Sequence, residues 1–313
     1  MLGGTHSRAA VCANPTQAQK PPPAPLPAQG TVASDISAIS SCVLWAGLHM
    51  IPPMAEDQLA YDFGTGGPAL VLLHSTVCDR RMWRGKQDVA LMAAGYRVVC
   101  CDLRGYGESR APVSPYNDAD DVLALLNDLR IDTFAIVGSS YGGQVALELA
   151  ARHPRRVAAL ALLCAAMPGS QPSEELRAFW AREGELVEQG DLDGATDLNV
   201  ATWLGPEADG AARDLVRRMQ RHAFEVQAGV TEQATATEHQ FDVSAIAVPV
   251  LAAWGAKDLP DFGCNAERLA RDLSSATAVE LPWAGHLPSV ERPQEINDLL
   301  VGYFRHAYPV KPA

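Results

Sequence analysis

The stretch AIVGSSYGGQ, residues 135–144, places two serines among glycines, directly after an apolar run and directly before a helical pattern. A serine on a sharp strand-to-helix turn has a strained backbone. Side chains two positions before and after it would collide, so the turn requires the spacing Gly-x-Ser-x-Gly. Gly138 and Gly142 flank Ser140 at these positions, whereas larger side chains flank Ser139. The spacing therefore selects Ser140 as the candidate nucleophile and leaves Ser139 to fill space behind it.

A serine hydroxyl is a weak nucleophile until a base takes its proton and a third group orients that base. Asp258 follows a strand-like run in LAAWGAKDLP, and His286 lies in the loop after the next such run, in ELPWAGHLPSVERP. The carboxyl ends of parallel strands meet at one sheet edge, so both side chains are expected near Ser140. Asp261 and Asp242 compete for the role of the acid, but only Asp258 follows a strand end within the turn WGAKD.

Other histidines compete with His286 for the role of the base. His74 directly follows the first buried run, where we expect it to brace a loop. His222 lies in a helical pattern and His306 in the last one, and both positions are remote from strand ends. His286 is therefore the predicted base.

Short, almost continuously apolar runs recur along the chain, as strands covered on both faces require. They are residues 69–73, 96–101, 133–138, 157–163, 249–254 and 276–281. Helix-like stretches lie between them, such as residues 117–129, which open with residues that favour a helix N-cap. Alternating strands and helices predict right-handed βαβ units in a doubly wound, mostly parallel α/β sheet.

One interval interrupts this alternation. From about residue 167 to residue 246 no strand-like run occurs, and SEELRAFWAREGELVEQ and AARDLVRRMQRHAFEVQ have helical periodicity. Helices inserted between two strands at the carboxyl edge, where ligands bind, predict a lid. The expected organisation is an N-terminal extension (1–53), a core domain (54–166 and 247–313) and a helical lid (167–246).

The first 53 residues differ in composition from the rest. The proline-rich tract QKPPPAPLPAQG forms neither helix nor strand ladder, so we expect the extension to be disordered and folding to begin near Met54. Residues 43–51, VLWAGLHMI, have about half the length that spans a bilayer, so no membrane span is expected. GTGGP, residues 64–68, is interpreted as a hairpin turn between two strands.

With 25 basic and 37 acidic side chains, the chain has a formal net charge of −12. This charge would repel a phosphate backbone, so no nucleic-acid partner is expected. The cysteines number seven, show no Cys-x-x-Cys spacing and lie partly in apolar runs, which favours buried thiols in a reducing, cytoplasmic location. No cluster has metal-ligand spacing and no Gly-x-Gly-x-x-Gly follows the first strand, so neither metal nor cofactor is expected.

Motifs over about residues 56–306 resemble the α/β-hydrolase superfamily, in its lidded, esterase- and lactonase-like branch. The matching motifs, in order, are LLHST, CDLRGYGES, GSSYGG, WGAKD and AGHLPSVERP. The order Ser, Asp, His is that of the family. The resemblance implies that Ser140 is the nucleophile, His286 the general base and then acid, and Asp258 the group that orients the imidazole.

The resemblance also implies an oxyanion hole made by the backbone N–H groups of Tyr141, the residue after the nucleophile, and of Thr76. The family usually has His-Gly where this chain has His74 and Ser75. Glycine permits backbone conformations that a side chain resists, so Ser75 makes the geometry of this loop a question for the structure.

The predicted function is a cofactor-free serine hydrolase that cleaves a small or medium uncharged ester or lactone through an acyl-enzyme. The alternatives are a carbon–carbon bond hydrolase, a thioesterase or a perhydrolase with the same triad, or a weakly catalytic ligand-binding protein, which Ser75 favours. Dehalogenase and epoxide-hydrolase relatives use an aspartate where this chain has Ser140. Apolar lid residues could line an acyl pocket or pack as core: Phe179, Trp180, Trp203, Met219 and Phe224.

Overall fold

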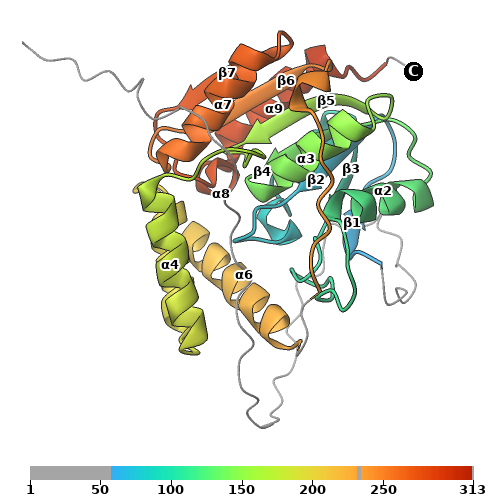
Figure 1. The fold of residues 1–313 in the computed structure, drawn as a ribbon. Helices are drawn as coiled ribbons and strands as arrows, with labels where there is room; N and C mark the ends of the chain where they lie inside the picture. Colours follow the sequence, from blue (N-terminus) through green and yellow to red (C-terminus); the bar gives the residue numbers. More distant parts are fainter. Residues whose placement is uncertain (1–57, 231–233, 312–313) are drawn as a thin grey trace, which may run out of the picture.

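The computed structural model describes residues 58–230 and 234–311, which contain a seven-stranded sheet in the order β1-β3-β2-β4-β5-β6-β7 (Figure 1). The strands are β1 (Tyr61–Phe63), β2 (Ala69–Leu73), β3 (Arg97–Cys101), β4 (Phe134–Ser139), β5 (Val157–Leu163), β6 (Val250–Gly255) and β7 (Ala276–Leu281). β1 pairs antiparallel with β3, and the remaining neighbours pair in parallel. The predicted mostly parallel α/β sheet is confirmed.

Helices connect the parallel strands and cover the sheet. They are α1 (Gln87–Ala93), α2 (Asp118–Asp128), α3 (Tyr141–Arg152), α4 (Glu174–Glu188), α5 (Leu192–Trp203), α6 (Gly210–Ala228), α7 (Pro260–Asp272), α8 (Pro288–Glu291) and α9 (Pro293–Ala307), with 3-10 turns η2 (Arg80–Met82) and η3 (Val243–Ala245). Asn117 starts α2 as predicted, since its side chain accepts the N–H of Asp120 at 2.8 Å.

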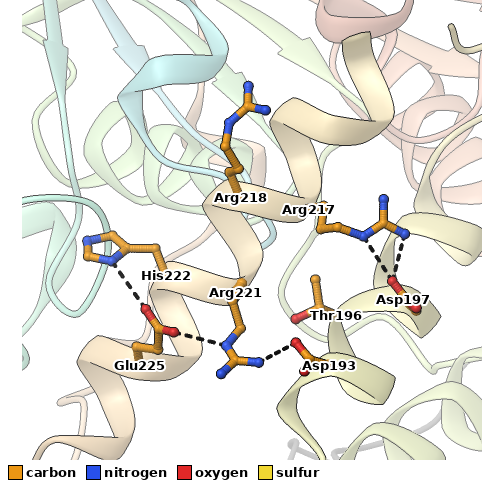
Figure 2. Close-up of a pocket in the computed structure, with 8 residues that line it drawn as sticks. All are labelled: Asp193, Thr196, Asp197, Arg217, Arg218, Arg221, His222 and Glu225. Carbon is orange, nitrogen blue, oxygen red and sulfur yellow. Dashed lines mark hydrogen bonds and ion pairs between the residues drawn. The ribbon is translucent and has the colours of Figure 1, made fainter. Parts of the chain in front are cut away.

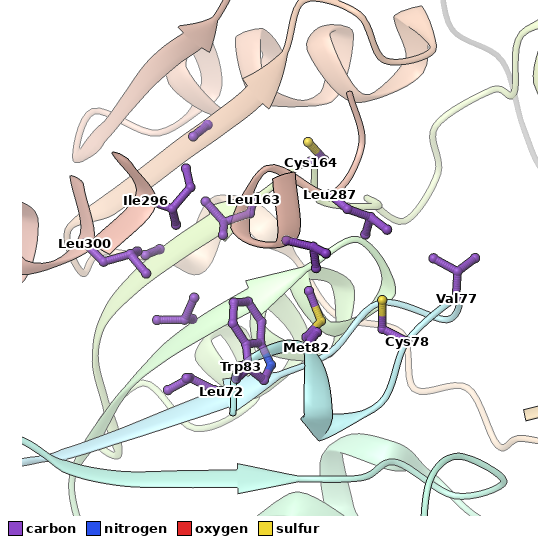
Figure 3. Close-up of a cluster of buried hydrophobic side chains, with 14 of the residues drawn as sticks. Leu72, Val77, Cys78, Met82, Trp83, Leu163, Cys164, Leu287, Ile296 and Leu300 are labelled. Atoms are coloured by element: carbon purple, nitrogen blue, oxygen red, sulfur yellow. The ribbon is translucent and has the colours of Figure 1, made fainter. Parts of the chain in front are cut away.

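Two apolar clusters form the core, one on each face of the sheet. Successive strand residues point to opposite faces, so Leu70 and Leu72 belong to one cluster and Val71 and Leu73 to the other. Figure 3 shows the first cluster, in which the ring of Trp83 lies beside Leu72. Burial on both faces explains why β2 and β4 have no alternation of polar residues.

The predicted hairpin at residues 64–68 is wrong, because β1 and β2 are not neighbours in the sheet. The segment crosses the start of β3 instead, so that β1 and β2 pair with opposite sides of that strand. The N–H of Gly64 donates to Val98 O at 2.8 Å, and the N–H of Arg97 donates to Pro68 O at 2.9 Å. Glycines and proline mark this crossing as they would mark a hairpin, so composition could not separate the two.

Helices α4, α5 and α6 lie between β5 and β6 in the chain, and Figure 1 shows α4 and α6 together at one end of the sheet. Leu186, Ala195 and Phe224 form a small cluster of their own among these helices. Other buried apolar residues of the helices join the same cluster as Trp83: Leu176, Phe179, Val200, Trp203, Ala212, Val216 and Met219. Several candidates for a pocket lining are therefore core residues. The division into a core domain and a lid at residues 167–246 stays a prediction.

The predicted extension at residues 1–53, with Met54 as the start of folding, lies outside the described residues. Within the described ranges, every helix is too short or too polar to cross a membrane.

Candidate active site

Ser140 lies between the end of β4 and the start of α3, with φ 53° and ψ −118°. This left-handed φ strains a residue with a side chain. A Cβ on Gly138 would come within 2.5 Å of Gly142 O, and a Cβ on Gly142 within 2.4 Å of Leu73 O. Both approaches are too short for any side chain, which is the steric condition that the glycine spacing predicted.

Hydrogen bonds to β5, to the loop after β5 and to the first turn of α3 hold the backbone of Ser140 in this conformation. Its N–H donates to Leu163 O at 2.9 Å, and its carbonyl accepts the N–H groups of Gly143 and Ala166, each at 2.9 Å. These bonds offset the strain of the turn. Ser139 is completely buried behind it, as expected of a space-filling residue.

Asp258 and His286 are in contact at the same edge of the sheet. The distance from His286 Nδ1 to Asp258 Oδ2 is 2.7 Å, and the two side chains are 2% and 0% exposed. Asp258 Oδ1 accepts the N–H of Leu259 at 2.7 Å, so both carboxylate oxygens are bonded. The arrangement leaves Nε2 as the imidazole nitrogen that can act on a substrate.

Two aromatic rings flank the imidazole of His286. The ring centroids lie 4.5 Å from Trp203, at the end of α5, and 4.1 Å from Phe262 on α7. The N–H of His286 also donates to Trp203 O at 2.9 Å. The sequence did not predict these contacts, because they join segments that are distant in the chain. Trp203 was a candidate pocket residue only because it is an aromatic residue in the inserted segment.

The competing acids and histidines have other contacts. Asp261 accepts the N–H of Ser173 at 2.6 Å, and Asp242 caps η3 by accepting the N–H of Ser244 at 2.9 Å. His222 Nε2 lies 2.9 Å from Gly107 O, and His306 Nδ1 lies 3.0 Å from Gly302 O. These contacts join loops and helices and do not bring the groups to Asp258 or His286.

His74 braces the loop that follows β2. Its Nδ1 donates to Ser75 O at 2.8 Å, and its Nε2 accepts the N–H of Leu103 at 2.9 Å. Burial lowers the pKa of His74, which favours the neutral imidazole that these two bonds require.

Ser75 does not have the left-handed conformation that favours glycine, so its side chain adds no backbone strain to this loop. It is completely buried, while Thr76 is exposed in a turn closed by the bond from Cys78 N–H to Ser75 O, 2.9 Å long. A Cβ on Gly142 would lie 2.7 Å from His74 O, so this loop passes directly beside the start of α3.

Tyr141 is the first residue of α3, where backbone N–H groups have no acceptor within the helix. Its hydroxyl donates to Asp118 Oδ2 at 2.8 Å. Burial raises the pKa of Asp118 to about 6. Because its backbone N–H has no acceptor within the helix, Tyr141 can donate that N–H to a negative charge that develops on a substrate. Its side chain points elsewhere, to the buried Asp118.

Asp102 and Arg104, the polar residues of CDLRGYGES, form ion pairs within the fold. Asp102 is completely buried and bonds the backbone N–H of Arg80 at 2.7 Å as well as the guanidinium of Arg80. Arg104 bonds both carboxylate oxygens of Asp121, at 2.5 and 2.9 Å. These pairs brace the loop that carries His74's partner Leu103.

Residues 68–293 match the family described as alpha/beta hydrolase fold, a range that covers well over half of the chain. The chain belongs to this family.

The hydrolase is 26% identical over 260 residues to 3-oxoadipate enol-lactonase 2 of Acinetobacter baylyi, covering 80% of this chain and 94% of the relative. It is 27% identical over 297 residues to the 2-hydroxy-6-oxononadienedioate/2-hydroxy-6-oxononatrienedioate hydrolase of Paraburkholderia xenovorans, covering 87% and 99%. The crystal structure of the enol-lactonase from Burkholderia xenovorans has a TM-score of 0.63 at 25% identity, over 79% of this chain and 96% of that one. These matches support the esterase- and lactonase-like branch that the motifs predicted.

Within the described part of the hydrolase, Cys164, Asp258 and His286 are the acidic, thiol and imidazole groups close enough to share a metal ion, with ligand atoms within 4.8 Å of one another. Burial raises the pKa of the Cys164 thiol well above its usual range, so without a metal the thiol is protonated. Its Sγ instead lies 3.7 Å from Gly285 O, in donor geometry. The chemistry of this cluster fits a hydrogen-bonded histidine better than a metal centre.

A groove of about 270 Å³ lies between α5 and α6, away from Ser140 in the chain (Figure 2). Arg217 pairs with Asp197 at 2.6 Å, and Arg221 pairs with Glu225 at 3.0 Å and also with Asp193. Figure 2 shows Arg217–Asp197 and Arg221–Asp193 linking α6 to α5, whereas Arg221–Glu225 lies within α6. The groove is thus a solvated surface crossed by ion pairs. Each such pair at a surface contributes little to the stability of the fold.

Proposed function

We propose that this hydrolase cleaves small or medium uncharged esters or lactones through an acyl-enzyme, with Ser140, His286 and Asp258 as its catalytic triad. The observation that carries the proposal is the buried 2.7 Å contact between His286 and Asp258 at the sheet edge that also holds the strained Ser140. Two carboxyl-edge loops and one strand-to-helix turn position the three groups.

In the acylation step, Ser140 Oγ attacks the acyl carbon of the substrate while His286 Nε2 accepts the hydroxyl proton. Asp258 stabilises the resulting imidazolium through Nδ1–H and keeps the ring oriented. General base catalysis of this kind contributes roughly 10²- to 10⁴-fold in rate. The bond to the leaving oxygen then breaks, and the imidazolium returns the proton to that oxygen.

The backbone N–H groups of Tyr141 and Thr76 are proposed to bind the oxyanion of the tetrahedral intermediate. Each such donor contributes on the order of 3 kcal/mol of transition-state stabilisation. Support comes from the close passage of the His74 loop beside the start of α3 and from the ordinary backbone conformation of Ser75. Both features agree with an active loop and weaken the case for a binding protein without turnover.

In the deacylation step, His286 removes a proton from water, whose oxygen attacks the acyl group on Ser140. The carboxylic acid leaves as Ser140 regains its proton. With a lactone the alcohol released in the first step remains attached to the acyl chain, so hydrolysis opens the ring and yields one hydroxy acid.

The preference for an uncharged substrate rests on where the arginines are placed. Arg80 is buried and paired with Asp102, Arg104 is paired with Asp121, and Arg217 pairs with an acid across the groove of Figure 2. Arginines held by carboxylates are poor receptors for a substrate carboxylate, since the existing pair would have to break. The two enol-lactonase relatives support a lactone ring as the bond that is cleaved; they do not support the absence of charge, because 3-oxoadipate itself carries carboxylates.

A carbon–carbon bond hydrolase is the second candidate, favoured by the Paraburkholderia relative, which aligns over 99% of its own length. That relative's name describes dioate substrates, which carry two carboxylates. The paired arginines of this chain favour an ester or lactone over such a substrate.

We place the enzyme in the reducing cytoplasm. Its cysteines in the described ranges are free thiols, and Cys78, Cys100, Cys101 and Cys164 are buried. Buried free thiols with raised pKa values are inert packing groups that need no oxidising compartment.

Labelling with a fluorophosphonate probe tests the nucleophile. We expect native protein to be labelled and the Ser140→Ala variant to remain unlabelled, while a Ser139→Ala variant keeps its label. An unlabelled native protein would contradict the proposed function. A panel of p-nitrophenyl esters, thioesters and lactones of graded length, with a vinylogous 1,5-diketone for carbon–carbon cleavage, then separates the substrate classes.

A further inference from the structure

Glu291, the last residue of α8, binds the backbone on both sides of His286. Its carboxylate oxygens accept the N–H of Gly285 at 3.0 and 3.1 Å, and Oε1 accepts the N–H of Leu287 at 3.3 Å. One side chain therefore binds the backbone N–H groups of the two residues on either side of the proposed general base.

The same carboxylate reaches the inserted helices. It lies against Gly205, two residues after the end of α5, and the backbone N–H of Gly205 favours its charged form, which lowers its pKa. A Cβ on Gly205 would come within 2.5 Å of Glu291 Oε2 and within 2.7 Å of Gly285 N, so the two backbones touch at this point.

A second backbone contact lies on the other side of the histidine loop. A Cβ on Gly255, at the end of β6, would come within 2.0 Å of Gly285 O. Gly205, Gly285 and Gly255 thus form a glycine stack. In this stack the loop that carries His286 packs between the end of the inserted segment after α5 and the end of β6, the strand that precedes Asp258.

Burial raises the pKa of Glu291, while the N–H donors of Gly285, Gly205 and Leu287 oppose this effect by stabilising the charged form. A partly buried carboxylate with several backbone donors is an ordered group, because losing it would leave those donors unsatisfied. The donors to the Glu291 carboxylate are backbone N–H groups. A carboxylate bound in this way holds the backbone of the histidine loop in one conformation.

We propose that Glu291 is a positioning residue for His286, and that it does so by binding the histidine loop to the end of α5. The proposal rests on the proposed function for the role of His286. Glu291 does not touch the reacting atoms. It acts through the loop, and so keeps the backbone N–H of His286 on the carbonyl of Trp203 and the imidazole in place.

The test compares Glu291→Gln with the control Glu295→Gln. The glutamine keeps one oxygen acceptor but turns an NH₂ group toward backbone N–H donors, while Glu295 is exposed on α9 and pairs only loosely with Arg292 at 3.5 Å. We expect Glu291→Gln to fold and to lose about 10- to 100-fold in kcat with KM changed less than about twofold, as a displaced general base would cause. Glu295→Gln should match the native enzyme.

Proton NMR gives a readout that does not require turnover. The Nδ1–H proton of His286, bonded to Asp258, should give a far-downfield resonance that Glu291→Gln shifts or broadens and Glu295→Gln leaves in place. Native protein that fails to react with the fluorophosphonate would contradict the proposed function alone, since this resonance still reports the position of the imidazole.

Two results would overturn the proposal. One is a folded Glu291→Gln variant with native kcat and a native His286 resonance. The other is a loss of activity that matches a loss of folded protein in thermal melts, with native kcat per folded molecule, because that would show a purely structural role.

Discussion

The carboxyl edge of the sheet and the inserted helices α4 to α6 contribute to the site in different ways. At the sheet edge, backbone is packed against backbone: a Cβ on Gly142 would lie 2.4 Å from Leu73 O. Among the inserted helices, Gly184 of α4 has no atom beyond its chain neighbours and its own helix backbone within 4 Å of where its Cβ would be. The sheet edge therefore has no space for an added methyl group at Gly142, whereas α4 has space for one at Gly184.

This contrast separates the parts of the site that tolerate change from those that do not. The elbow around Ser140 depends on atoms that cannot move without shifting a strand. The inserted helices reach the site mainly through one short stretch, where Trp203 contacts His286 and Gly205 contacts Glu291. Substitutions elsewhere in these helices should therefore leave the catalytic geometry intact.

The largest effect is expected from Gly142→Ala. The added methyl group meets the carbonyls of Leu73 and His74 at 2.4 and 2.7 Å, and both belong to the backbone at the end of β2. We expect a loss of about 3 kcal/mol or more in the free energy of unfolding, together with a fall in activity, because the loop that follows β2 must shift. Urea denaturation and ester hydrolysis check this, and native stability would show that the edge is not closed.

Asp118→Asn probes the buried acid behind Tyr141. The folded pKa of Asp118, about 6, lies above its ordinary value of 3.8, so ionisation weakens the fold. The wild type should lose stability relative to the variant as pH rises from about 4 to about 6.5. The difference in unfolding free energy between the two should change by up to about 3 kcal/mol in the variant's favour. Urea denaturation at pH 4 and pH 7.5 measures it, and a constant difference would contradict the raised pKa.

Ser140→Gly should remove activity and stabilise the fold. Glycine adopts the φ of 53° without the strain that a serine side chain suffers. Part of the gain is lost to the greater freedom of glycine in the unfolded chain, so we expect about 1 kcal/mol net. Thermal melts of Ser140→Gly and Ser140→Ala compare the two. A Ser140→Gly protein that melts below Ser140→Ala, as the unfolded-chain freedom of glycine alone would cause, would mean that the elbow stores no strain.

The smallest effect is expected from Gly184→Ala, the matched counterpart of Gly142→Ala in the inserted helices. Here alanine fits in open space within a helix, so its better helix propensity should add about 0.5–1 kcal/mol to stability. Ester hydrolysis should be unchanged. A destabilised Gly184→Ala protein would erase the contrast between the two regions.

Most of the sheet and its carboxyl edge could be predicted from sequence, because the signals there are local. Each buried strand is a continuous apolar run, and the glycine spacing around Ser140 expresses a clash over a few residues. Asp258 and His286 were chosen by their positions after strand ends, and the structure brings them into contact. The roles of all three groups remain a proposal.

The contributions of Phe262, Trp203 and Glu291 could not be predicted in the same way. Each contacts His286 or its loop from another element, and apolar or acidic residues on helices give no sign of which distant loop they meet. The hairpin predicted at residues 64–68 was wrong for a related reason. Glycine and proline indicate a change of chain direction, but they do not indicate which strand the next strand pairs with.

The glycine stack of Gly205, Gly285 and Gly255 has a consequence for protein engineering. Exchanging the inserted helices between relatives is an attractive route to new substrate range, because the insertion begins and ends at separate strands. A transplanted segment would need a glycine at the position of Gly205, where the chain meets Gly285. It would also need a backbone carbonyl at the position of Trp203, two residues earlier, to accept the N–H of His286. Chimeras that respect this junction should retain a competent histidine, whereas those joined by sequence length alone should fold around a displaced one.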